Sequence, residues 1–107
     1  MPITQYTARQ LQQAMQEDEA WLLLDVREDH EYQYARIEGS VHIPLQQLPQ
    51  RLAELNPAPK IAVICHHGVR SLHACQFLEY AGFNNLYNLQ GGIDAWSVTC
   101  DSSIPRY

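Results

Sequence analysis

Short runs of apolar residues alternate along the chain with segments whose apolar positions recur at the spacing of a helix. The run at 21–24 is continuously apolar, as is typical of a strand covered on both faces of a sheet. Residues 41–43, 60–64 and 86–89 predict three more short strands. Strands that alternate with helices indicate an α/β fold with a largely parallel sheet.

Two of the helical segments have clear start or stop signals. Thr7 and Gln10 fit a capping box, in which each side chain bonds the backbone N–H of the other residue. Apolar residues then follow one helical face at Ala8, Leu11, Ala14 and Met15. Residues 72–81 predict a longer helix that ends at Gly82, a natural C-terminal stop.

Three further segments predict helices with weaker signals. The polar stretch at 28–36 predicts a short helix, and residues 93–97 predict a single helical turn. Leucines between 45 and 55 recur at helical spacing, and Pro49 falls in the predicted first turn, where its missing N–H does least harm.

Length and charge narrow the class of protein. A chain of 107 residues predicts one domain, over residues 1–107, whose hydrophobic core can be large enough to fold without disulfides or a structural metal. The net charge of −5 does not favour nucleic acid or an anionic membrane surface as a partner. The apolar runs are also far too short to cross a membrane. We therefore expect a globular domain that binds neither nucleic acid nor membrane.

The cysteines predict a reducing environment. The chain has three, Cys65, Cys75 and Cys100, and this odd number at wide spacing does not suggest a disulfide framework. No secretory signal is visible at the N-terminus, so a cytoplasmic location is expected. Cys75 falls on the apolar face of the helix at 72–81 and is expected in the core. Cys100 is a candidate for resolving an oxidised Cys65.

Candidate chemistry is concentrated where the strand at 60–64 ends. Cys65 enters a short loop there, Arg70 follows five positions later, and a helix begins behind it. Backbone N–H groups of such a loop, and those that open the helix, bind anions at its centre. They favour the thiolate of Cys65, which is the nucleophilic form. Gly68 permits a backbone turn that a side chain would hinder. Cys65 is thus the predicted nucleophile.

The predicted substrate loop comprises His66, His67, Gly68, Val69, Arg70 and Ser71. Arg70 has two possible roles: it holds the loop, or it binds the oxygens of an anionic donor with its planar fork. Asp25 and Arg27 follow the strand at 21–24. They belong at the same sheet edge as Cys65, because the carboxyl ends of parallel strands meet there. We expect them to form a structural pair that supports the site.

The two histidines are expected to shape the loop and to add positive charge at lower pH. Cys65, His66, His67 and His73 raise the possibility of zinc. However, the contiguous triplet cannot easily wrap one tetrahedral ion. The sequence therefore predicts no metal and no cofactor.

Four segments resemble the signatures of the rhodanese family of single-domain sulfurtransferases, in the family's order and spacing. They lie within residues 23–96 and are Leu24-Asp25-Val26-Arg27 with Glu31-Tyr32, then 37–44, 65–71 and 91–96. The resemblance implies a five-stranded parallel sheet flanked by helices on both faces. It also implies transfer of a sulfane sulfur through a persulfide of the cysteine. Departures at Ala35-Arg36, Gly39-Ser40 and His66-His67 affect donor preference rather than reaction class.

The resemblance predicts a thiosulfate sulfurtransferase. Its partners would be a small anionic sulfur donor and a thiophilic acceptor, namely cyanide, a thiol or a protein. Two alternatives stay open. Phosphatases and arsenate reductases of the related fold have five residues between cysteine and arginine, whereas this loop has four. A regulatory or binding module that carries a persulfide is also compatible with the loop.

Overall fold

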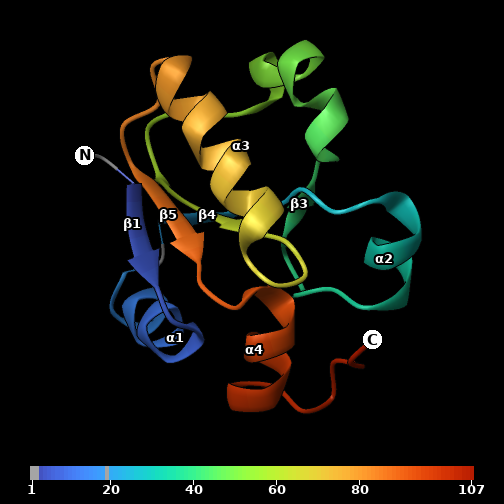
Figure 1. Cartoon of the computed structure of the whole chain (residues 1–107). Helices are drawn as coiled ribbons and strands as arrows, with labels where there is room; N and C mark the ends of the chain where they lie inside the picture. Colours follow the sequence, from blue (N-terminus) through green and yellow to red (C-terminus); the bar gives the residue numbers. More distant parts are fainter. Residues whose placement is uncertain (1–2, 19) are drawn as a thin grey trace.

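A parallel five-stranded sheet lies at the centre of the protein, as the computed structural model of residues 3–18 and 20–107 shows (Figure 1). All four pairings between neighbouring strands are parallel. The strand order is β1 (Ile3–Tyr6), β5 (Leu86–Leu89), β4 (Lys60–Ile64), β2 (Trp21–Asp25) and β3 (Val41–His42). The predicted α/β class with a parallel sheet is confirmed.

Helices cover both faces of the sheet, so the two sides of each central strand are buried. In β4, Ile61 and Val63 belong to one hydrophobic cluster, and Ala62 and Ile64 belong to the other. This division follows from the two-residue period of a strand. The first cluster lies under α3 (Val69–Tyr80) and the 3-10 helices η1 (Leu45–Gln50) and η2 (Leu52–Glu54). The second lies under α1 (Ala8–Glu17) and α4 (Gly92–Thr99).

Local signals placed several elements correctly. The capping box at α1 is present, with the Thr7 side chain accepting from the Gln10 N–H and the Gln10 side chain accepting from the Thr7 N–H. The strands predicted at 21–24, 60–64 and 86–89 form with bounds that differ by at most one residue. A short helix, α2 (Asp29–Tyr34), occupies the polar stretch predicted at 28–36.

Other expectations were wrong. The leucines between 45 and 55 form two 3-10 helices instead of one α-helix. Pro49 lies inside η1, five residues after the Pro44 cap, where an α-helix would need an N–H that proline lacks. The strand β1 was not predicted, because its half-polar sequence has no apolar run and it forms by pairing with β5. The last helix spans eight residues instead of a single turn.

The carboxyl ends of β2, β4 and β5 meet at one edge of the sheet. Asp25 is in register with Ile64, and Val63 is in register with Asn88. The segments that leave this edge therefore begin close together, and they carry the residues predicted to act.

Candidate active site

Cys65 lies directly after β4, in the loop that leads into α3, and is only 1% exposed. The backbone N–H of Gly68 donates a hydrogen bond to its Sγ at 3.0 Å. Gly68 has a φ of 103°, in the left-handed region that favours glycine. A methyl group on it would also lie 3.3 Å from the Leu89 carbonyl oxygen. The turn that brings this N–H to the sulfur therefore requires glycine, as expected.

A buried polar chain supports the cysteine from the side of the sheet. The Sγ of Cys65 donates to the Ser71 hydroxyl at 3.3 Å, and this hydroxyl donates to the side-chain oxygen of Asn88. Asn88 in turn donates to the carbonyl of Gly68 at 3.2 Å and to the side chain of Gln5 at 2.9 Å. The side chains of Ser71 and Asn88 thus have their hydrogen-bond partners although they are buried, and Asn88 ties both Gly68 and Ser71 to β5.

The start of α4 fixes the other side of the loop. The N–H of Ile93 donates to the Cys65 carbonyl at 2.8 Å, and the N–H of Asp94 donates to the His66 carbonyl at 3.2 Å. Gly92 has a φ of 63°, and a side chain there would overlap the His66 carbonyl. The C=O and N–H of one peptide unit point in opposite directions. The bonds to the Cys65 and His66 carbonyls therefore turn the N–H groups of His66 and His67 away from α4.

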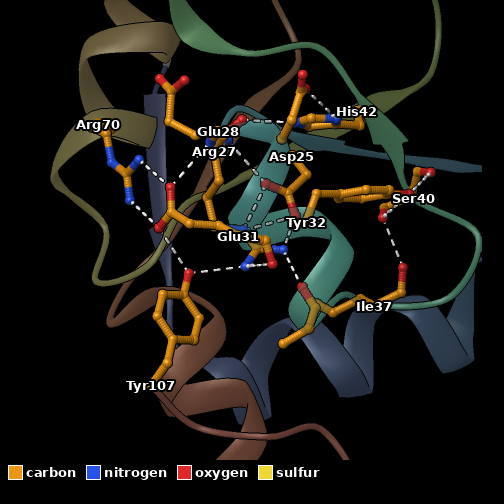
Figure 2. Close-up of polar contacts among 12 residues, drawn as sticks. Asp25, Arg27, Glu28, Glu31, Tyr32, Ile37, Ser40, His42, Arg70 and Tyr107 are labelled. Atoms are coloured by element: carbon orange, nitrogen blue, oxygen red, sulfur yellow. Dashed lines mark hydrogen bonds and ion pairs between the residues drawn. The ribbon is translucent and has the colours of Figure 1, made fainter.

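Arg70 is anchored by a carboxylate. Its two terminal nitrogens donate to the two oxygens of Glu31 on α2, at 2.7 and 2.9 Å (Figure 2). The Arg70 hydrogen bonds lower the pKa of Glu31 from its usual 4.5 to about 2, although burial acts in the opposite direction. The same pair raises the pKa of Arg70. Of the two predicted roles for Arg70, this bidentate geometry favours holding the loop, because the fork is already occupied.

The predicted pair of Asp25 and Arg27 is present and fully buried, with a shortest N–O distance of 2.6 Å. Arg27 uses its remaining donors on the backbone carbonyls of Glu31 and Ala35 and on the hydroxyl of Tyr107. Figure 2 shows this guanidinium enclosed by its partners. Arg27 therefore supports α2 and the glutamate that anchors Arg70, and its donors are all directed at protein groups.

The two histidines stack on each other, with ring centres 3.9 Å apart. His66 also stacks on the ring of Tyr107, at 3.8 Å and an angle of 9°. Burial lowers the pKa of His66, and the neighbouring His67 lowers it further. His66 is consequently a neutral aromatic contact near pH 7, and its expected positive charge is confined to more acidic conditions.

One group of possible metal ligands lies beside the loop. Ligand atoms of His66, His67 and Asp94 come within 4.8 Å of one another. The two imidazole rings are inclined to each other by 27°, and Asp94 is already paired with Arg106 at 2.9 Å. A structural zinc site uses four ligands, whereas this group has three, and an ion here would compete with Arg106 for Asp94.

Three residues of the site were missed as site residues by the sequence interpretation. Glu31 was noted only as part of a family segment, without a role. Asn88 is a polar residue inside an otherwise apolar, buried strand, and that signal was available. Tyr107 follows a tail without recognisable pattern, and nothing in the sequence links it to Glu31 or His66.

Comparison with known proteins identifies the family. The sequence model of the family described as "Rhodanese-like domain" matches residues 7–99 of this chain. The chain therefore belongs to the rhodanese-like domain family. A structure of a rhodanese-like domain protein from Staphylococcus aureus has a TM-score of 0.83 at 27% identity, over 97% of this chain and 98% of that one. The sheet and helices described above are thus the family's fold.

Two curated relatives are similar to most of this chain, and the name of one of them states a sulfurtransferase activity. The thiosulfate sulfurtransferase GlpE of Actinobacillus pleuropneumoniae is 34% identical over 80 residues, which cover 75% of this chain and 74% of that protein. The rhodanese-like/PpiC domain-containing protein 12 of Arabidopsis thaliana, a chloroplastic protein, is 37% identical over 99% of this chain. This chain spans 38% of the Arabidopsis protein's length. Across residues 3–18 and 20–107, no helix has the length and apolar character to cross a membrane.

Proposed function

We propose that this protein is a sulfurtransferase that takes a sulfane sulfur from a small anionic donor such as thiosulfate onto Cys65. It then passes the sulfur to a thiophilic acceptor, either cyanide or a thiol, including a thiol on a protein. The observation that carries this proposal is the position of the Cys65 sulfur, held by the Gly68 N–H inside a loop fixed on both sides.

The reaction has two steps. The Cys65 thiolate attacks the outer sulfur of thiosulfate, the S–S bond of the donor breaks, and sulfite leaves with the electron pair. The acceptor then attacks the outer sulfur of the persulfide, and Cys65 departs as a thiolate. In each step the two reactants exchange no electrons with a third reagent, so neither step requires an oxidant or a cofactor.

The loop's residues have distinct roles in this proposal. The Gly68 N–H stabilises negative charge on the sulfur in both steps. Ser71 orients the cysteine through its hydroxyl, and Arg70 holds the end of the loop against Glu31. Four residues between Cys65 and Arg70 make a loop suited to one sulfur atom, smaller than the loop of the related phosphatases.

We also propose a reducing, cytoplasmic setting. All three cysteines are free, and a reducing compartment keeps the Cys65 thiolate available.

Mass spectrometry of the intact protein tests the proposal. Incubation with thiosulfate should add about 32 Da, the mass of one sulfur atom in a covalent intermediate. Cys65→Ser should abolish this addition, and Cys100→Ser, which changes a partly exposed cysteine in the tail, should retain it. The proposal is wrong if the wild-type mass is unchanged by thiosulfate and by other sulfane donors while a phosphate ester is hydrolysed.

A further inference from the structure

The segment after α4 returns to the candidate active site. Residues 100–107 lie beyond the region that matches the family model, which ends at residue 99. Figure 1 shows this segment, in red, running from α4 toward α2. Ile104 is buried in the second hydrophobic cluster, and its carbonyl accepts from the Ser97 hydroxyl at 2.6 Å. Arg106 pairs with Asp94 on α4. These contacts fix the path of the tail up to its last residue, Tyr107.

The ring of Tyr107 contacts the beginning of the Cys65 loop. It lies flat on the imidazole of His66, the residue next to Cys65, with ring centres 3.8 Å apart. Tyr34 of α2 packs edge-on against Tyr107 at 6.0 Å and an angle of 86°. His66 is thus held between the tail on one side and His67 on the other.

The hydroxyl of Tyr107 reaches the anchor at the end of the same loop. It donates to Oε2 of Glu31 at 2.9 Å and accepts from Arg27 at 2.9 Å. That Glu31 oxygen also accepts from Arg70. Figure 2 shows the phenol directed into this cluster of charged groups. Burial raises the pKa of Tyr107 to about 12, so the hydroxyl keeps its proton and remains a donor at neutral pH.

One side chain therefore contacts both ends of the loop, His66 directly and Arg70 through Glu31. We propose that Tyr107 is a positioning residue that holds the loop in the conformation in which the Gly68 N–H meets the Cys65 sulfur. A hydrogen-bond donor stabilises charge on an atom only when the backbone that carries it is fixed beforehand. The link to sulfur transfer rests on the proposed function, but the reactivity of Cys65 can be measured without it.

The test is the pH dependence of Cys65 alkylation by iodoacetamide, followed by mass spectrometry in the Cys100→Ser background. Tyr107→Leu removes both the ring stack and the hydroxyl, and we expect the pH of half-maximal rate to rise. Tyr107→Phe keeps the stack and should give a smaller rise. Tyr80→Leu is the matched control, since this tyrosine is 91% exposed on α3, and its profile should equal that of the wild type.

Sulfur uptake from thiosulfate should fall about tenfold in Tyr107→Leu, mainly in the limiting rate at saturating donor. A purely structural tail would lower the melting temperature and leave the alkylation profile unchanged, and that result overturns the proposal. If Tyr107→Leu does not fold, an unchanged alkylation profile in Tyr107→Phe also overturns the proposal. If the profile shifts but the wild type takes up no sulfur, the proposed function fails and the positioning role stands.

Discussion

The pair of Glu31 and Arg70 makes a quantitative prediction about stability and pH. Glu31→Gln removes the negative charge and leaves the two donors of Arg70 facing an amide that can accept with only one oxygen. The glutamine side chain is nearly the same size and shape as the native glutamate. Any change in the free energy of unfolding therefore reports the loss of a charged acceptor, which Arg70 shares with the Glu28 N–H and the Tyr107 hydroxyl, and not a packing defect.

The magnitude follows from the pKa of Glu31. A fall from 4.5 to about 2 in the folded protein corresponds to about 3 kcal/mol. Arg70 keeps 35% of its side chain exposed, and solvent screens the pair, so we expect about 1–2 kcal/mol. The lowered pKa means that this stabilisation is complete above the unfolded value of about 4.5. It is lost as the pH falls toward 2, because the unfolded chain binds the proton more tightly.

Urea unfolding between pH 2.5 and 7, followed by tryptophan fluorescence, measures this contribution. Glu31→Gln should be less stable than the wild type at pH 7, and the difference should shrink to about a quarter of that value at pH 2.5, because the folded pKa is about 2. Glu54→Gln is the control, because Glu54 forms a similar pair with Arg51 on the open surface and should change stability less. A difference between wild type and Glu31→Gln that is as large at pH 2.5 as at pH 7 would refute the reasoning.

Three further predictions concern the residues around the loop. Gly92→Ala should lower the free energy of unfolding by about 1–3 kcal/mol and should slow sulfur uptake. The reason is that the added methyl group would overlap the His66 carbonyl, at a φ that favours glycine. An unchanged thermal unfolding curve would contradict this. Ser71→Ala should cost about 1–3 kcal/mol in urea unfolding, because it leaves the buried oxygen of Asn88 without a donor; equal stability of variant and wild type would show that Asn88 finds another partner. Burial raises the pKa of Cys75 to about 12, so iodoacetamide at pH 8 should label Cys75 last among the cysteines of the native protein; peptide mapping that finds early labelling of Cys75 would be inconsistent with its place in the core.

Much of the fold was accessible from the sequence. The continuous apolar run at 21–24 and the one that ends at Ile64 became central strands, because a strand buried on both faces has no polar position. The Thr7 capping box formed because its two partners are three residues apart, and no distant group is needed. The loop at Cys65 was identified as a candidate site for a similar reason, since its candidate residues are neighbours in sequence.

Other elements depended on distant partners. In the strand β1 only the two end residues, Ile3 and Tyr6, are apolar. The strand forms because it pairs in parallel with β5, which lies more than 80 residues away in sequence. The segment with Pro49 kept its leucines at helical spacing, yet the missing N–H diverted it into 3-10 turns that still bury Leu48. Periodicity identified the buried residues there but not the type of helix.

The sequence by itself determined the class of fold, the candidate nucleophile Cys65 and the need for glycine at its turn. These features depend on residues within a few positions of one another, and local sterics and apolar patterning are sufficient to specify them. Only the tertiary structure decided what holds the loop. Glu31 meets Arg70 across 39 residues, and Tyr107 meets Glu31 across 76. Such pairs form because the sheet brings the strand ends and the segments that follow them to one edge, where partial burial strengthens each hydrogen bond to a charged group.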